Sequence, residues 1–143
     1  MPYWLLKSEP DVFGWDDLVR AGQTFWDGVR NYQARNNLQA MCVGDEGLFY
    51  HSNLGKACVG VVRVVQEAAP DPTAGPGDLA KNGTNPWVGV VVVPVRPLAR
   101  PVTLAMVKAE PKLANMALLT TARLSVQLVR ADEWARILQM AEG

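Results

Sequence analysis

Two valine-rich segments, residues 57–66 and 87–95, most strongly limit the folds open to this chain. In both segments apolar residues occupy odd-numbered as well as even-numbered positions. Because successive side chains of a strand point to opposite faces, each expected strand is apolar on both faces. A strand of this kind is buried on both sides, as happens when a curled sheet is also covered by helices. Each apolar run is far too short to span a membrane as a helix. We therefore expect these two strands at the centre of the fold.

The remaining elements are short and irregularly mixed. Further strands are expected at residues 3–7, 47–52, 102–104 and 123–129. Apolar residues at helical spacing predict four helices, the first closed by Gly22, the second capped by Asn31, the third spanning 105–119 with a break at Pro111, and the last containing Trp134. Residues 67–86, rich in proline and glycine, are expected to form a long exposed loop. This spacing does not suit alternating βαβ units. It favours an α+β fold: a mostly antiparallel β-barrel flanked by short helices.

Length and composition indicate one ordinary globular domain covering residues 1–143. Hydrophobic residues make up 49% of the 143 residues and charged residues 20%. The first apolar stretch ends at Lys7 and is too short for a signal peptide. We therefore expect a cytoplasmic protein that does not associate with membranes. Cys42 and Cys58 lie in apolar surroundings and are expected to be buried free thiols. With a single histidine, His51, the chain has too few soft ligands for zinc, and we expect no metal and no cofactor.

Three segments, residues 7–10, 26–36 and 49–53, carry more polar and aromatic chemistry than folding requires. They combine aromatic rings with hydroxyls, amides and arginines. A ring beside such groups can hold a flat heterocycle, because the ring stacks on it while the polar groups bind its edge. Trp26 is the candidate stacking ring, although a tryptophan packed into the core would look the same in the sequence.

The other candidate ligand contacts fall into three groups. Donors and acceptors for the edge of the ring are Ser8, Asn31, Ser52, Asn53 and Ser125. Glu9 or Asp27 can accept from an exocyclic amine, which favours a cytosine-like or adenine-like ring. The cations expected to face phosphates are Lys7, Arg30, Arg35, Lys56 and Arg123. Tyr50 and Leu124 complete the expected site. Alternatively, Glu9 caps a turn and Arg123 pairs with a carboxylate.

Two other functional classes stay open. An enzyme acting on a nucleotide-like molecule would need His51, Lys7 or Glu9 as its reactive group. Neighbours on a strand, such as His51 and Ser52, point to opposite faces, and no Gly-x-Ser-x-Gly motif is present, so we expect no catalytic residue. The third class is a protein-interaction module that uses the 67–86 loop.

Several segments also carry a resemblance to a known family. They read Tyr-Trp-Leu-Leu-Lys-Ser-Glu-Pro at 3–10, Trp-Asp-Gly-Val-Arg-Asn-Tyr-Gln-Ala-Arg-Asn at 26–36, Gly-Asp at 44–45, Leu-Phe-Tyr-His-Ser-Asn at 48–53 and Arg-Leu-Ser-Val at 123–126. In order and over nearly the whole chain, they resemble the EVE domain of the PUA-like superfamily. The resemblance implies a PUA-like barrel in a cytosolic or nuclear protein related to the YTH readers of methylated RNA.

In those YTH relatives, residues that look equivalent to Lys7-Ser8, Trp26 and Ser52-Asn53 are kept. The EVE family itself is associated with modified DNA bases, notably 5-methylcytosine and its oxidised forms. We therefore expect a monomeric, non-enzymatic module that holds a flipped-out, modified base of a nucleic acid, with DNA favoured and a reader of modified RNA bases as the alternative. YTH pockets enclose a methyl group with several aromatic rings, whereas only Trp26 is placed by motif in this chain. That difference argues against N6-methyladenine as the bound base.

Overall fold

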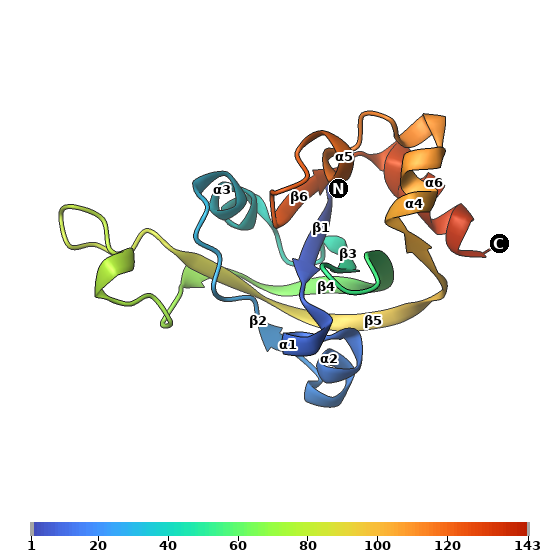
Figure 1. Ribbon diagram of the computed structural model, residues 1–143. Helices are drawn as coiled ribbons and strands as arrows, with labels where there is room; N and C mark the ends of the chain where they lie inside the picture. Colours follow the sequence, from blue (N-terminus) through green and yellow to red (C-terminus); the bar gives the residue numbers. More distant parts are fainter. Residues whose placement is uncertain (1, 143) are drawn as a thin grey trace.

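The computed structural model describes residues 2–142 and contains one six-stranded mixed sheet (Figure 1). Its strands are β1 (Tyr3–Ser8), β2 (Thr24–Phe25), β3 (Glu46–His51), β4 (Ala57–Pro70), β5 (Val88–Thr103) and β6 (Val126–Val129), in the spatial order β2-β5-β4-β3-β1-β6. β1 and β3 run parallel, and the other neighbouring pairs are antiparallel. The α+β class expected from the sequence is confirmed.

The expected closed barrel is wrong. β2 and β6 lie at opposite ends of the strand order, and within residues 2–142 no strand pairing joins them, so the sheet is open. β2 has only two residues, and its ladder with β5 extends only over Val91 and Val92. Such a short strand offers too few hydrogen bonds to close a barrel, whatever the curvature of the long strands.

Six α-helices in the described part of the chain surround the sheet, namely α1 (Pro10–Phe13), α2 (Trp15–Ala21), α3 (Tyr32–Ala40), α4 (Leu104–Ala109), α5 (Ala117–Thr120) and α6 (Ala131–Glu142). Two short 3₁₀ turns, Pro76–Asp78 and Pro111–Leu113, lie between them. Gly22 ends α2 with a φ of +80°, and the side chain of Asn31 accepts the Ala34 N–H at 3.0 Å at the start of α3. Both caps and the break at Pro111 agree with the sequence-based expectations.

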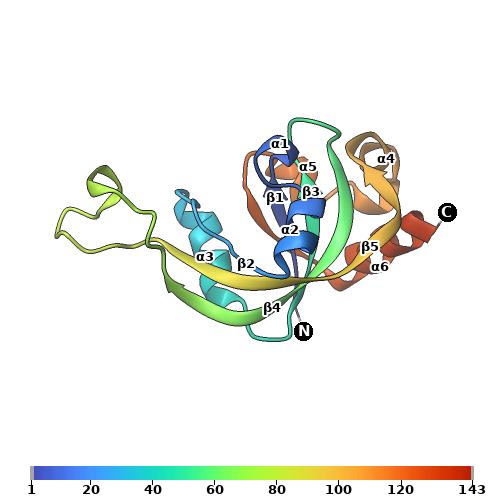
Figure 2. The same ribbon diagram turned by 90° about the horizontal axis from the view of Figure 1, so that it is seen from below.

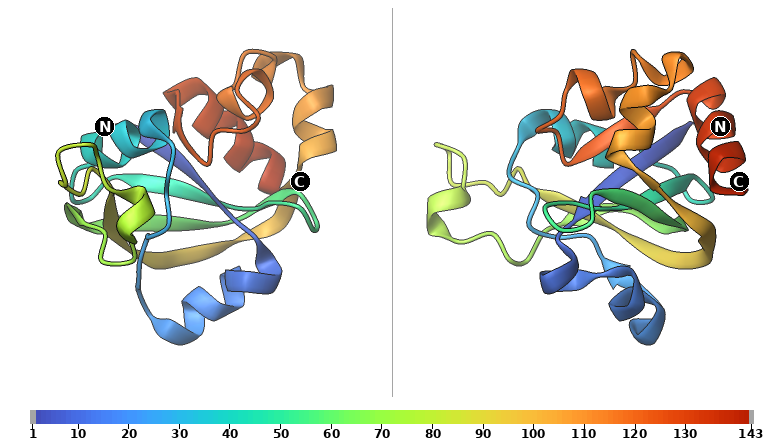
Figure 3. Two further views of the ribbon diagram at one scale, coloured as in Figure 1. Left: turned by 60° about the vertical axis from the view of Figure 1, so that its left-hand side comes forward. Right: turned by 45° about the vertical axis from the view of Figure 1, so that its right-hand side comes forward.

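Alternate residues of the central strands pack into two separate cores. Leu6 and Phe49 belong to a cluster with Trp15, Trp26 and Leu38, whereas Leu5 and Tyr50 belong to a second cluster. α2 and α3 contribute to the first cluster, and α4 and α6 to the second. Figure 3 shows α1 and α2 on the opposite side of the sheet from α4–α6. Because helices cover both faces of the sheet, the valine-rich strands carry apolar side chains on both faces.

β4 and β5 are longer than the sequence indicates. The prolines at 94, 97 and 101 predict a connection before a short strand at 102–104, yet β5 is continuous from Val88 to Thr103. Beyond its two-residue pairing with β2, the outer side of β5 is an edge, where proline removes no ladder hydrogen bond. Register shifts along the β4–β5 pairing absorb the irregular backbone. β4 takes up residues 67–70 of the expected loop, so the loop spans residues 71–87 and protrudes from the body (Figure 1).

Both cysteines are free, as expected, but only Cys58 is buried. Cys42 is exposed because it lies in the turn between α3 and β3, where its N–H donates to Asp45. No helix within residues 2–142 has both the length and the apolar character needed to cross a membrane.

Candidate functional site

A cavity of about 580 Å³ lies between the end of β1, α1 and the chain around β2. Its lining residues are Lys7, Ser8, Glu9, Val12, Phe13, Thr24, Phe25, Trp26, Asp27 and Gly28. The volume falls in the range of about 300–1,000 Å³ that is usual for small-molecule sites. Two of the three chemically rich sequence segments therefore meet at one cavity. The sequence indicated neither the apolar part of the lining, from Val12, Phe13 and Phe25, nor Thr24, whereas Gly28 lies within the 26–36 segment.

Trp26 is both a core residue and a wall of this cavity. Its side chain is 8% exposed and meets the ring of Phe49 edge-on, at 5.6 Å between centroids and an interplanar angle of 85°. The Trp26 N–H donates to the Val90 carbonyl at 2.7 Å, which fixes the backbone against β5. Among residues 2–142 its indole N–H has no hydrogen-bond partner, and this N–H group is not fully buried. The indole is therefore held rigidly, with a donor left for a bound molecule.

Hydrogen bonds join the end of β1 to the turn that follows β3. The Ser52 N–H donates to the Ser8 carbonyl at 2.9 Å, and Asn53 Nδ2 donates to Glu9 Oε1 at 2.7 Å. The Ser8 hydroxyl donates to the Phe13 carbonyl at 2.6 Å, so its oxygen can still accept. The second carboxylate oxygen of Glu9 can likewise still accept a hydrogen bond. The third sequence segment thus supports the cavity rim through Ser52 and Asn53.

Lys7 connects the cavity to the segment before β6. Its Nζ donates to the Ala122 carbonyl and lies 5.8 Å from the centre of the Tyr50 ring. Burial lowers the pKa of Lys7. The Lys7 N–H also donates to the Ser125 carbonyl at 2.9 Å, which brings residues 122–125 next to β1. Within that segment Arg123 is exposed, whereas Leu124 packs into the first core.

Tyr50 does not face Trp26. It is 3% exposed and packs in the second core, on the other face of the sheet, because it follows Phe49 in the strand. Burial, with a smaller contribution from Cys58, raises its pKa to about 12. Lys56 lines a separate hollow, and the Asn31 side-chain oxygen is engaged by the α3 cap. Tyr50 is therefore not a second ring facing Trp26, and its role as a ligand contact stays a prediction.

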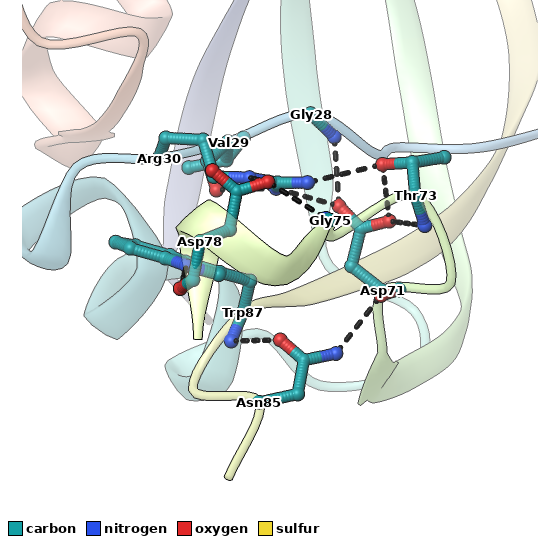
Figure 4. A network of polar contacts seen from close by, with 9 residues as sticks. All are labelled: Gly28, Val29, Arg30, Asp71, Thr73, Gly75, Asp78, Asn85 and Trp87. Atoms are coloured by element: carbon teal, nitrogen blue, oxygen red, sulfur yellow. Dashed lines mark hydrogen bonds and ion pairs between the residues drawn. The ribbon is translucent and has the colours of Figure 1, made fainter. Parts of the chain in front are cut away.

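Arg30 is held by carboxylates rather than left free for phosphate (Figure 4). Its Nη1 lies 2.9 Å from Asp71 Oδ2, and its Nε lies 3.3 Å from Asp78 Oδ2. The guanidinium group also lies 5.7 Å from the centre of the Trp87 ring. Since its charge is already compensated, the expectation that Arg30 contacts phosphate has no support in this geometry.

Asp71 is fully buried and connects the protruding loop to the cavity wall (Figure 4). Its Oδ2 accepts the Gly28 N–H at 2.8 Å, and its Oδ1 accepts the N–H and hydroxyl of Thr73. Burial by itself would raise the pKa of Asp71, but the hydrogen bonds from Thr73, Arg30 and Gly28 outweigh it and lower the pKa to about 2. Sequence reasoning missed Asp71. Its only local signal was the Asp-x-Thr spacing of an Asx turn.

An aromatic and cationic stack lies beside this network. Arg35 lies 5.0 Å from the centre of the Tyr32 ring and donates to the Pro86 carbonyl. The Tyr32 ring packs in turn on Trp87, with 4.7 Å between centroids. Arg35 pairs with no carboxylate among the described residues, so its charge stays available to an anion.

His51 is engaged in the fold. Its Nε2 accepts the Trp15 N–H at 3.1 Å, which requires the unprotonated nitrogen. Burial lowers the pKa of His51 below its ordinary 6.5, although Asp16 opposes the shift. The folded protein therefore binds this proton less readily than the unfolded chain does.

We expect the stability of the protein to fall as the pH drops through about 6.5 towards the lower folded-state pKa of His51, and to be fully restored above 6.5. The loss is expected to approach about 1 kcal/mol, the usual contribution of one hydrogen bond. Urea unfolding of wild type and His51→Gln between pH 7.5 and 5 measures it. His51 is the only histidine, so the two proteins share all other titrations. A wild-type-to-variant difference that is constant with pH would contradict this assignment.

The comparisons with known proteins agree on one family. The EVE domain family model matches residues 2–140. Human thymocyte nuclear protein 1 is 38% identical, with 98% of this chain and 74% of the human protein covered. The crystal structure of protein Atu2648 from Agrobacterium tumefaciens superposes with a TM-score of 0.91 at 44% identity, covering 99% of this chain and 93% of that one.

Another solved relative is human THYN1 in complex with 5-methylcytosine-containing DNA, which superposes with a TM-score of 0.88 at 35% identity and covers 100% of this chain and 99% of that one. The YTH domain of Zygosaccharomyces rouxii MRB1, solved with N6-methyladenosine RNA, has a TM-score of 0.59 at 15% identity, covers 99% of this chain and 85% of that one, and is alike in fold alone. The motifs around the cavity, the open sheet and the family match over residues 2–140 lead to one conclusion: this chain belongs to the EVE domain family.

Proposed function

We propose that this chain is a nucleic-acid-binding module that holds one extruded base, of the 5-methylcytosine type, in the cavity beside Trp26. The observation that carries the proposal is the cavity itself, which combines an indole wall with a rim of charged and hydroxyl groups. It occurs in a chain that superposes closely on human THYN1, solved with 5-methylcytosine DNA.

The cavity residues suit a cytosine-like ring. Trp26 supplies the stacking surface, and base stacking on an aromatic side chain contributes about 1–3 kcal/mol. Carboxylates from Glu9 and Asp27 are the acceptors that an exocyclic amine needs, and the Lys7 ammonium is a donor for a ring carbonyl. Phe25 and Val12 provide apolar contact for a 5-methyl group.

Arg35 and Arg123 are the proposed phosphate contacts of the strand that carries the base. Arg123 is exposed beside the Lys7–Ser125 contact, and Arg35 projects from α3. Ser52 and Asn53 support the rim through their hydrogen bonds to the Ser8 carbonyl and to Glu9. Ser125, whose carbonyl accepts the Lys7 N–H, and Leu124 are proposed to lie next to the bound base. The contribution of the two arginines is expected to weaken as salt increases, because binding releases counterions from phosphate.

Replacing Trp26 by leucine is expected to weaken binding of a 5-methylcytosine oligonucleotide by about 5- to 150-fold, the equivalent of a lost stacking interaction. Leucine keeps apolar bulk in the core but cannot stack. Fluorescence anisotropy with single-stranded oligonucleotides of one sequence, carrying cytosine, 5-methylcytosine or 5-hydroxymethylcytosine, measures the effect. The same oligonucleotides as RNA test whether DNA is preferred.

Trp134→Leu is the matched control. Trp134 is as buried as Trp26 but stacks on Tyr3 in the second core, with 4.3 Å between ring centroids. It is expected to lose stability and to keep base discrimination. Wild type that binds all the oligonucleotides equally, or the two variants behaving alike while folded, would refute the proposal.

An enzymatic role has less support. The Nε2 of His51 is occupied by the Trp15 N–H, and the Lys7 ammonium donates to a backbone carbonyl. Neither group is free to act as a base in its present contacts. Glu9, the third candidate, accepts a hydrogen bond from Asn53 Nδ2 through Oε1, and its other oxygen is assigned above to the exocyclic amine of the base. We therefore propose binding without turnover.

The monomeric state expected from the sequence stays a prediction. So does the cytoplasmic location, and the vertebrate relatives carry the word "nuclear" in their name, which favours a different compartment for them.

A further inference from the structure

The turn between β3 and β4, residues 52–56, presents an exposed leucine on an unusual backbone. Leu54 is 59% exposed. It lies between Asn53, with a φ of +64°, and Lys56, with a φ of +36°, and within residues 2–142 these are the only non-glycine residues with positive φ. This conformation is disfavoured for residues with a Cβ and is held by surrounding contacts.

Contacts on both sides fix the turn. Asn53 Nδ2 donates to Glu9 Oε1 on the cavity rim, and the Lys56 carbonyl accepts the Leu104 N–H at 2.8 Å. Figure 2 shows the turn and α1 at the same edge of the molecule. Leu54 is therefore presented to solvent by a braced turn rather than by a loose loop.

The far side of this turn borders a second hollow, of about 340 Å³. It is lined by Gly55, Lys56, Thr103, Leu104, Ala105 and Lys108, a set with two lysines and no carboxylate. On the cavity side, by contrast, Glu9 and Asp11 are exposed acids. A phosphate backbone would be repelled from α1 and attracted to the lysines. Leu54 thus stands between a base-sized cavity and a cationic hollow.

We propose that Leu54 inserts into the base stack of a duplex, at the place from which the bound base has been extruded, while Lys56 and Lys108 contact a phosphate of the same duplex. The inference rests on the proposed function. Extruding a base leaves a gap in the stack, and apolar side chains, leucine among them, replace the lost contact in proteins that open DNA base steps. A single strand has no such gap to fill, so Leu54 matters only for duplex binding.

The test measures binding of one 5-methylcytosine oligonucleotide sequence, as a single strand and as a duplex, by fluorescence anisotropy. The proteins compared are wild type, Leu54→Ala, Leu54→Met and Leu128→Ala. Leu128 is the matched control, 49% exposed on β6. Leu54→Ala is expected to weaken duplex binding about tenfold, in line with lost apolar burial, and to leave single-strand binding unchanged. Leu54→Met, which keeps apolar length, and Leu128→Ala are expected to match wild type on both.

Three results would overturn the inference while leaving base binding intact. They are equal duplex affinity of Leu54→Ala and wild type, equal weakening of both forms by Leu54→Ala, and wild type that binds the single strand but not the duplex. Failure of wild type to distinguish 5-methylcytosine from cytosine in the single strand would instead refute the proposed function.

Discussion

Replacing Asp71 by alanine is expected to lower the free energy of unfolding by about 3 kcal/mol, the lower end of the cost of breaking a buried ion pair. The carboxylate is fully buried, and the hydrogen bonds that it accepts from Gly28, Arg30 and Thr73 are all lost in the alanine variant. The cost stays at the lower end because the Arg30 side chain is 26% exposed and keeps Asp78 as a partner. Urea unfolding monitored by tryptophan fluorescence measures the change.

Asp78→Ala is the control for this prediction. Asp78 binds the same guanidinium group but is itself partly exposed, and an ion pair screened by solvent in this way contributes little to stability. Because Asp71 also holds Gly28 in the cavity wall, its alanine variant is expected to bind the modified oligonucleotide more weakly than the Asp78 variant does. Equal losses of stability in the two variants would show that the buried carboxylate is not the anchor of the loop.

Gly89→Ala is expected to destabilise the protein by about 1–3 kcal/mol, the range for inserting a methyl group into a well-packed core, and to disturb the cavity at the same time. An ideal Cβ at Gly89 would lie 2.4 Å from the Trp26 carbonyl oxygen and 2.7 Å from the Phe25 ring. The nearer atom belongs to the backbone and cannot rotate away. Trp26 would have to move, and with it the 2.7 Å hydrogen bond from its N–H to Val90.

Thermal unfolding and oligonucleotide anisotropy of Gly89→Ala test this directly. Gly77→Ala is the matched substitution, since a Cβ there meets nothing within 4 Å. It is expected to change stability by less than about 0.5 kcal/mol. If Gly89→Ala unfolds and binds like Gly77→Ala, Trp26 is not held against β5 as tightly as the contact distances indicate.

Elements with local signals were predictable from the sequence. The strand at 3–7, the Gly22 end of α2 and the Asn31 cap of α3 each depend on residues within a few positions of one another. Trp26, Ser8 and Glu9 were proposed as contacts of one ligand because their segments combine an aromatic ring with polar groups, and they do line one cavity. Alternation along β3 predicts that Phe49 and Tyr50 face opposite sides, but not which of the two faces Trp26.

Longer-range features were not predictable in the same way. Proline residues at 94, 97 and 101 read as a connection, because the sequence does not reveal that the outer side of β5 is an edge. The prediction of a closed barrel was wrong because closure depends on the length of the strands at the two ends of the sheet, which the sequence does not reveal. The end strand β2 has only two residues.

The sequence by itself determined the two-faced apolar strands, the helix caps and the chemistry available to a ligand, because each of these is encoded in nearby residues and in period-two or helical spacing. Only the tertiary structure decided that Arg30 is neutralised by Asp71, that Tyr50 belongs to the other core and that Leu54 stands beside the cavity. These contacts join residues far apart in the chain, such as Arg30 and Asp71, and depend on the path of the backbone and on which face of a strand each side chain occupies.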